Sequence, residues 1–282
     1  MSQNKQPIKF AQNLSWPEAP RWKDGLLWIS DVHNFRVISI DAEGKIASEI
    51  KIEGRPAGMD FIENDKILIA TGVSKQLLEI NTSNGEVHPV ADLGESVKGS
   101  LNDLVTHKNG WSWVGDTGFI YNQDVPKNCG QIFAYHPKYG VKSVISDVFF
   151  PNGMVVTPDG KSLYVNETFA NKISRFDILE DGNLGNRTTH ANLPGSPDGL
   201  CLDAEGYLWV PLLFEEKFVR VSSKGEVVQE INFPNKNTIA CMTGGTDRKK
   251  LYLCVANIEA KNPKTKGEIY SVDIDTSGAG RP

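Results

Sequence analysis

Short apolar runs separated by polar turns that contain Gly or Asp recur along the whole chain. In the first unit, apolar runs occupy residues 19–22, 26–31 and 36–40, with a polar turn at 23–25 and another at 41–44. The alternation within these runs and the turn residues between them are typical of antiparallel strands. No segment has the apolar spacing of an amphipathic helix of three turns, so a parallel sheet with crossover helices is disfavoured. The pattern predicts an all-β protein.

The same unit occurs six times along the chain. The units begin at residues 18, 57, 102, 152, 198 and 240, which are 39, 45, 50, 46 and 42 residues apart. This spacing is close to the roughly 40–50 residues of a four-stranded propeller blade. It predicts a six-bladed β-propeller forming one domain over residues 1–282, in which a strand at about residues 8–14 completes the last blade and so removes an exposed edge. The largest insertion within a blade, residues 118–129, is expected to lie over one face of the ring.

The first residue of each unit is a candidate for the central channel, because the first strand of each blade lines that channel and points toward the axis. Two carboxylates beside an apolar channel are costly unless a cation neutralises them, and no Lys or Arg occupies any of the six positions. Carboxylate and amide oxygens suit Ca²⁺, Mg²⁺ or Mn²⁺ better than a structural zinc site. In chain order the six positions are Glu18, Ala57, Asn102, Asn152, Asp198 and Ala240.

From these positions we expect Glu18, Asn152 and Asp198 to hold one divalent cation, with Ca²⁺ the first choice. The alternative is that Asn102, Asn152 and Asp198 merely cap tight turns, which the following Gly153 and Gly199 would permit.

Composition narrows the range of partners. The formal net charge of −5 gives no electrostatic reason to expect nucleic acid or an anionic membrane, so a small-molecule ligand is expected. The first residues lack the apolar segment of a secretory signal, and no window approaches the roughly eighteen apolar residues of a membrane span. We therefore expect a cytoplasmic protein.

The other reactive residues are expected to have structural roles. The four cysteines have no C-x-x-C spacing and are expected to be free thiols, most of them buried. No G-x-S-x-G motif occurs, so a Ser-His-Asp triad is not indicated, and the five histidines are expected to be exposed to solvent. Asp31, Asp116 and Glu167 end the second strands of their units and are expected to stabilise turns.

Several motifs carry a more specific resemblance. In chain order they are P-E-A-P at 17–20, L-N-D at 101–103, P-N-G-M at 151–154, P-D-G-L at 197–200 and C-M-T-G-G at 241–245. With these motifs, the chain resembles SMP-30/gluconolactonase/luciferin-regenerating-enzyme-like proteins, also called regucalcin-like sugar lactonases, over almost its whole length.

The resemblance implies roles for the blade-start residues. It implies that Glu18, Asn152 and Asp198 bind one divalent cation, calcium or zinc, and that Asn102 contacts metal-bound water or substrate. It also implies that Asp198 is the proton acceptor.

Two positions depart from the family pattern. Ser100 stands where sugar-acid lactonases carry Arg, and Ile120 stands where they carry an acidic residue. Fewer polar side chains are therefore available to bind a sugar than in sugar-acid lactonases. Candidate pocket aromatics favour a less polar lactone. These aromatics are Phe119, Tyr121, Phe149 and Phe169.

These observations predict metal-dependent hydrolysis of a small lactone, with Asp198 taking the proton of water and with Ser100, Asn102 and Asp103 contacting substrate or water. The alternatives are hydrolysis of aryl esters or organophosphates on the same metal, hydrolysis of another non-sugar substrate, and a non-catalytic binding propeller. A protein-binding platform of the WD40 kind should show recurring Gly-His and Trp-Asp signals, and none is present.

Overall fold

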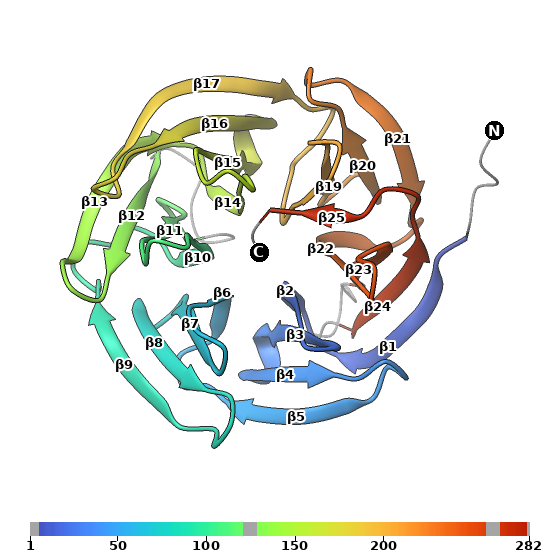
Figure 1. Cartoon of the computed structure of the whole chain (residues 1–282), viewed down its shortest axis with the longest axis horizontal. Helices are drawn as coiled ribbons and strands as arrows, with labels where there is room; N and C mark the ends of the chain where they lie inside the picture. The colour runs from blue at the N-terminus through green and yellow to red at the C-terminus, as the bar shows by residue number, and fades with distance from the viewer. Residues whose placement is uncertain (1–5, 121–128, 258–265, 281–282) are drawn as a thin grey trace.

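Six antiparallel sheets surround a central axis as the blades of a β-propeller (Figure 1). The computed structural model describes residues 6–120, 129–257 and 266–280. Within each sheet the strands follow one another outward from the channel, as expected of up-and-down meanders. The predicted six-bladed, all-β architecture is confirmed.

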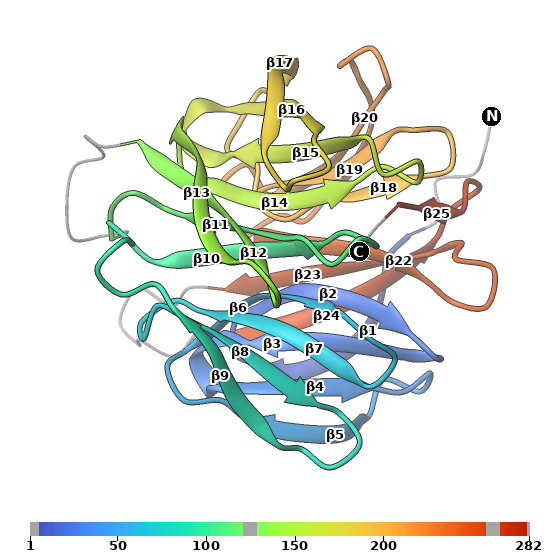
Figure 2. The ribbon, with the colours of Figure 1, turned by 60° about the vertical axis from the view of Figure 1, so that its left-hand side comes forward.

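The first three blades each contain four consecutive strands. Figure 2 shows the blade of β10–β13 between its neighbours on either side. The strands of these blades are β2 (Pro17–Lys23), β3 (Leu26–Asp31), β4 (Arg36–Ile40), β5 (Ile46–Lys51), β6 (Pro56–Phe61), β7 (Lys66–Thr71), β8 (Gln76–Asn81), β9 (Val87–Asp92), β10 (Leu101–Thr106), β11 (Ser112–Asp116), β12 (Gly130–His136) and β13 (Gly140–Val148).

The last three blades include strands from the two ends of the chain. Blade four is regular, blade five gains β25, and blade six gains β1. The strands are β14 (Pro151–Val156), β15 (Ser162–Glu167), β16 (Lys172–Ile178), β17 (Leu184–Asn192), β18 (Cys201–Asp203), β19 (Leu208–Leu212), β20 (Lys217–Val221), β21 (Val227–Asn232), β25 (Gly278–Ala279), β22 (Asn237–Gly244), β23 (Lys250–Asn257), β24 (Lys266–Asp273) and β1 (Ile8–Leu14).

Both ends of the chain therefore take part in the ring. Strand β1 pairs antiparallel with β24 and forms the outer edge of the last blade, so the first and last segments share one sheet. Strand β25 was not expected from the sequence. It pairs with the inner strand β18, through Leu202↔Ala279 and Asp203↔Gly278, and brings the C-terminal segment to the centre of the ring (Figure 1).

The apolar core is divided among the blade interfaces. Alternate side chains of a strand point to opposite faces, so each blade packs against both neighbours. In β3, Leu27 and Ile29 join the cluster shared with blade six, whereas Trp28 joins the cluster shared with blade two. Six such clusters, one for each pair of adjacent blades, close the circle.

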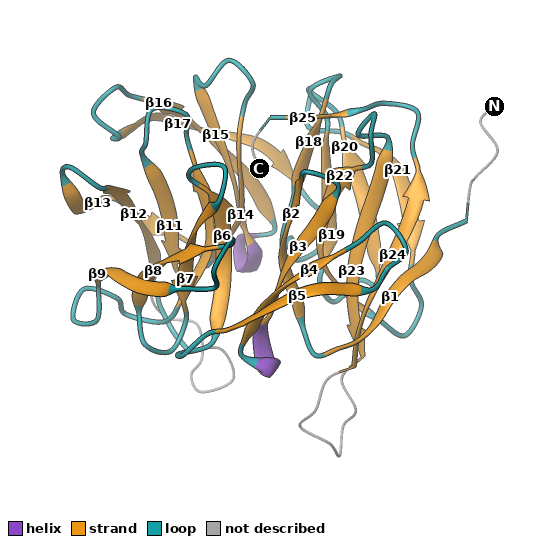
Figure 3. Ribbon diagram, turned by 60° about the horizontal axis from the view of Figure 1, so that its bottom comes forward, coloured by secondary structure: helices purple, strands orange, loops and turns teal. Residues whose placement is uncertain are grey.

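Helical structure is minimal in the described part of the chain, as Figure 3 shows. It consists of two single 3-10 turns, η1 (Val32–Asn34) and η2 (Thr168–Ala170), which follow the second strands of blades one and four. None of the helices in this part of the chain is long and apolar enough to cross a membrane.

Candidate active site

Every inner strand departs from regular pairing at the point where the blade-start residues lie. In β2, Glu18 pairs with Ser30 and Arg21 with Trp28, so β2 carries one residue more than β3 over this stretch. Equivalent shifts occur in β6, β10, β14 and β22, and the pairing before β18 is interrupted in the same way. A β-bulge changes the direction of the side chains around it. The repeated bulge therefore accounts for side chains of different blades meeting near the axis.

Two glycines allow the inner strands to approach one another closely. A Cβ atom on Gly153 would lie 2.6 Å from the carbonyl oxygen of Asp198, and one on Gly199 would lie 2.8 Å from the Cβ of Ala240. Neither glycine has a positive φ. They therefore serve close packing of strands, and the alternative that Asn152 and Asp198 cap tight turns does not describe this structure.

A cavity of about 370 Å³ opens where these strands begin. In blade six its lining residue is Asn237, and Ala240 lies deeper in the strand. Ala240 is therefore the one predicted blade-start residue that does not line the cavity. All six residues predicted to bind metal or substrate line the cavity, namely Glu18, Ser100, Asn102, Asp103, Asn152 and Asp198.

Glu18 lies on β2 and is held by its neighbours in sequence. Its Oε1 accepts a hydrogen bond from the indole Nε1 of Trp16 at 3.2 Å, and its Oε2 accepts one from the backbone N of Ala19 at 3.3 Å. Burial raises the pKa of Glu18 well above its ordinary value, and the negative charges of Asp198 and Asp103 raise it further. No Lys or Arg among the described residues forms an ion pair with this carboxylate.

Asp198 is fixed by its backbone just before β18. Its carbonyl oxygen accepts hydrogen bonds from Gly153 N at 3.1 Å and Asn166 Nδ2 at 2.7 Å, and its own N donates to Pro211 O at 3.1 Å. Burial raises the pKa of Asp198 well above its usual range, the Asn152 amide opposes that rise, and Asp103 adds to it. Asp198 is only 3% exposed, so its charge is costly without a cation.

Asn152 is oriented by the residue that follows the second strand of its own blade. Its Nδ2 donates to Thr168 Oγ1 at 3.1 Å, and Thr168 Oγ1 in turn donates to Pro197 O at 2.8 Å. With the amide nitrogen directed to Thr168, the amide oxygen remains as the group that could ligate a cation.

Asp103 has a different environment from Glu18 and Asp198. Arg21, buried three residues after Glu18, approaches Asp103 Oδ1 at 3.4 Å and Asp60 Oδ1 at 3.8 Å. The other Asp103 oxygen accepts from Met154 N at 3.3 Å. Burial raises the pKa of Asp103, and Arg21 is the largest influence that lowers it. The channel therefore contains a protein cation that the six blade-start positions did not reveal.

The donor chemistry fits a hard divalent cation. Within the described ranges, no three Asp, Glu, His or Cys side chains cluster closely enough to form a ligand set alone. Glu18 and Asp198 would therefore need amide oxygens beside them, and Asn152 supplies one. Two like-charged carboxylates without a protein counter-ion are the arrangement that a bound divalent ion relieves.

Asn102 and Ser100 lie on the blade-three side of the cavity. The Asn102 Nδ2 is 3.5 Å from Pro151 O, and Asn102 is partly exposed to the cavity. The Ser100 backbone N donates to Thr117 Oγ1 at 2.9 Å, which fixes the chain while the Ser100 side chain lines the cavity.

An aromatic wall stands on the blade-four side. Phe119, Phe150 and Phe169 pack together with ring centroids 5.1–5.6 Å apart. Phe150 and Phe169 line the cavity, and Phe150 takes the place that the sequence suggested for Phe149. Ile120 also lines it, which leaves this wall apolar, whereas Tyr121 lies outside the described residues.

Several lining residues were not anticipated. Trp16 and Asn237 accompany the blade starts, while Arg55 and His33 come from the loops of the first two blades. The expectation that all histidines are exposed was wrong, because His107 is 7% exposed and His136 and His190 are only partly exposed. A loop arginine carries no sequence pattern that distinguishes it from a surface residue.

The carboxylates at the ends of the second strands are fully engaged by the protein. Asp31 accepts hydrogen bonds from Ser15, Asn34 and Arg36. Asp116 accepts from the backbone N of Lys98, Gly99 and Gly118, and Glu167 accepts from Phe149 N and Arg187. These residues stabilise turns, as the sequence suggested.

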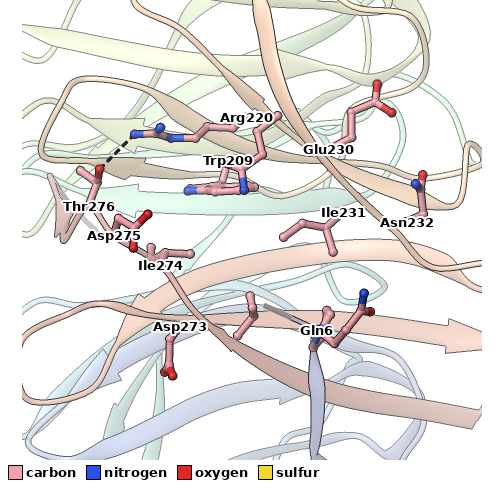
Figure 4. A pocket seen from close by; sticks show the side chains of 13 residues that line it. Gln6, Trp209, Arg220, Glu230, Ile231, Asn232, Asp273, Ile274, Asp275 and Thr276 are labelled. Atoms are coloured by element: carbon pink, nitrogen blue, oxygen red, sulfur yellow. Dashed lines mark hydrogen bonds between the residues drawn. The ribbon is translucent and has the colours of Figure 1, made fainter. Parts of the chain in front are cut away.

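A second cavity, of about 250 Å³, lies between the outer parts of blades five and six (Figure 4). Its walls include Trp209, Arg220 and Glu230 on one side and residues 273–276 on the other. None of the predicted site residues lines it. The cavity at the strand starts is therefore the candidate active site.

Comparison with known proteins finds relatives along most of the chain. Residues 16–257 match the SMP-30/Gluconolactonase/LRE-like region. Regucalcin from Xenopus laevis is 27% identical over 248 residues, covering 85% of this chain and 82% of its own. The 6-deoxy-6-sulfogluconolactonase of Pseudomonas putida is 24% identical and covers 94% of this chain and 93% of its own.

Solved structures share the fold. A luciferin-regenerating enzyme superposes with a TM-score of 0.81 at 16% identity, over 97% of this chain and 98% of its own. A regucalcin from Agrobacterium tumefaciens, described as a calcium-binding protein, gives a TM-score of 0.81 at 22% identity, over 95% and 93%. With the family match spanning most of the sequence, this chain belongs to the SMP-30/gluconolactonase/LRE-like family.

Proposed function

We propose that this protein is a metal-dependent lactonase that opens the ester bond of a small lactone. The observation that carries the proposal is the pair of carboxylates, Glu18 and Asp198, which face one cavity and form no ion pair with a Lys or Arg of the described residues. The distant relationship to a sulfogluconolactonase supports the same reaction class.

Glu18, Asn152 and Asp198 would hold the ion, for which Ca²⁺ is the first choice because all the donors are oxygens. Zn²⁺, Mn²⁺ and Mg²⁺ are the other candidates. The chemistry that such a cation supplies is polarisation of the lactone carbonyl, stabilisation of the developing oxyanion and acidification of the attacking water.

The protein groups would carry the proton. Asp198 accepts a proton from water as the water oxygen bonds to the carbonyl carbon, and returns it to the ring oxygen when the ester C–O bond breaks. Asn102 and Ser100 orient the substrate from blade three. Trp16 and Thr168 act as positioning residues, because they hold Glu18 and Asn152.

The pocket wall favours a substrate that is less polar than a sugar acid. Phe150, Phe169 and Ile120 offer apolar surface where the lactone substituents would lie. The same surface keeps an aryl ester as the second candidate substrate, since a phenyl ring would pack against these aromatics.

The test removes metal with a chelator, restores Ca²⁺, Zn²⁺, Mn²⁺ and Mg²⁺ separately, and follows proton release from sugar-acid lactones, aliphatic lactones and phenyl acetate. We expect metal-dependent lactone opening, and a loss of kcat of at least about 100-fold in Asp198→Asn. As a matched control, Asp116→Asn changes a buried carboxylate outside this ligand set.

Turnover of phenyl acetate without turnover of any lactone would move the assignment to an esterase. Full lactone turnover by Asp198→Asn with metal still bound would refute the proton-accepting role. Metal binding without turnover of either substrate class would contradict an enzyme of this kind.

A further inference from the structure

Arg55 presents a guanidinium to the candidate active site. It lies in the turn before β6, with a φ of 55°, and its side chain lines the same cavity as Glu18 and Asp198. It is partly buried, and that burial lowers its pKa from the ordinary value. A half-buried guanidinium needs a partner that replaces the water it has lost.

No such partner is found among residues 6–120, 129–257 and 266–280. Arg21, Arg36, Arg175, Arg187 and Arg220 each pair with a carboxylate. Arg248 donates to the Thr243 hydroxyl. The Arg55 side chain has neither kind of contact.

Arg55 is also not a counter-ion of Glu18 or Asp198. The charges that perturb the pKa of Glu18 are those of Asp198 and Asp103, and the influences on Asp198 are burial, Asn152 and Asp103. Arg55 perturbs His33 instead, where its positive charge helps burial to lower the histidine pKa. The guanidinium is therefore close enough to His33 to lower its pKa, and it forms no ion pair with Glu18 or Asp198.

The backbone of Arg55 is fixed by the fold. Gly72, just after β7, donates its backbone N to Arg55 O at 2.9 Å. A Cβ on Gly72 would lie 2.9 Å from Arg55 Nη2 and 3.3 Å from Nε. The guanidinium thus lies against a glycine, and a side chain at position 72 would collide with it.

We propose that Arg55 binds an anionic oxygen group, a carboxylate, sulfonate or phosphate, carried by the substrate at a distance from its lactone carbonyl. Arginine donates paired hydrogen bonds to such groups in a fixed planar geometry. The substrate would then have three parts, a lactone at Glu18 and Asp198, an apolar body against Phe150 and Phe169, and an anion at Arg55. This substrate class rests on the proposed lactonase function.

The test uses the calcium-loaded protein and two kinds of probe. Non-hydrolysable probes are cyclopentanone and cyclopentanone carrying a carboxylate, a sulfonate or a phosphate ester, and binding is measured by calorimetry. Hydrolysable probes are the γ-butyrolactones with the same substituents. Comparing the carboxylate, sulfonate and phosphate probes identifies which anionic group the protein prefers.

The variants are Arg55→Met, which removes the charge, and Arg55→Lys, which keeps the charge without the planar fork. Arg175→Met is the matched control, because Arg175 pairs with Asp177 outside the cavity. Gly72→Ala is an independent variant that should displace the guanidinium without changing its charge.

We expect the parent to bind an anionic ketone about 10- to 100-fold more tightly than cyclopentanone. Arg55→Met should lose that preference, Arg55→Lys and Gly72→Ala should reduce it, and Arg175→Met should keep it. Equal binding of charged and neutral ketones by the parent, or an undiminished preference in Arg55→Met, would overturn the proposal. If the protein prefers anionic ketones but opens no lactone, Arg55 binds anions and the lactonase proposal is refuted. If it opens lactones without preferring anionic ketones, the lactonase proposal stands and the role of Arg55 is refuted.

Discussion

Two pairs of carboxylates, Asp60 with Asp103 and Glu18 with Asp198, differ in how their charge is balanced. Asp60 and Asp103 are joined to Arg21, whose Nη1 and Nη2 also donate to Pro20 O and Leu104 O. Glu18 and Asp198 have no protein cation in the described part of the chain, and burial raises the pKa of both. Arg21 partly compensates the first pair, whereas no ion pair among the described residues compensates the second.

The difference shows how one channel combines a structural and a functional role. Arg21 links blades one, two and three through buried contacts, so its charge stabilises the ring. Glu18 and Asp198 have no such cation within the described ranges, so their charges destabilise the folded protein unless an ion neutralises them. Four changes test this contrast.

The largest effect is expected from Arg21→Met. Removing this cation leaves Asp60 and Asp103 buried without compensation, and breaking a buried pair in this way costs about 3–5 kcal/mol. Urea unfolding of the metal-free protein measures the loss. As a control, Lys217→Met breaks the more exposed pair with Glu230 and should cost less than about 1 kcal/mol. Equal losses in the two variants would remove the contrast between the two pairs of carboxylates.

Calcium should stabilise the protein through Glu18 and Asp198. An ion that binds only the folded protein adds about 2.7 kcal/mol when present at 100 times its Kd. Glu18→Gln and Asp198→Asn should lose most of this gain, while Asp116→Asn should keep it. Thermal unfolding with and without Ca²⁺ provides the measurement, and an unchanged gain in Glu18→Gln would place the ion elsewhere.

The pH dependence of the metal-free protein should follow the raised pKa values of Glu18 and Asp198. Between the unfolded pKa of about 4.3 for Glu and the higher folded pKa, the folded state binds more protons, so stability falls as pH rises through this window. Glu18→Gln should flatten the fall and stabilise the protein by about 1–2 kcal/mol above the window. A variant less stable than the parent at pH 8, or a parent with no such fall, would contradict the assignment.

The smallest effect is expected from Trp16→Phe, which removes the hydrogen bond to Glu18 Oε1 and keeps an aromatic ring. Loss of a group that orients a metal ligand weakens affinity by about 10-fold at the lower end of the usual range. Calorimetric titration with Ca²⁺ measures it. Trp22→Phe serves as control, since Trp22 stacks on Tyr252 at the interface of blades six and one. If the two variants bind Ca²⁺ alike, the Trp16 contact has no positioning role.

The sequence by itself determined the repeated fold. Strand alternation and turn residues are local signals, and the six spaced units predicted the blades correctly. The repeat also led to Glu18, Asn102, Asn152 and Asp198, because equivalent positions of inner strands must approach the same axis. It failed at Ala240, where the channel-facing residue of blade six is Asn237.

Only the tertiary structure decided which charges are balanced. The bulges that aim the blade-start side chains arise from strand pairing, which local sequence does not specify. Arg21 reaches carboxylates on the next two blades, and Arg55 reaches the cavity from a turn. Such contacts depend on where separate blades bring their side chains in space, so neither a motif nor a repeat could reveal them.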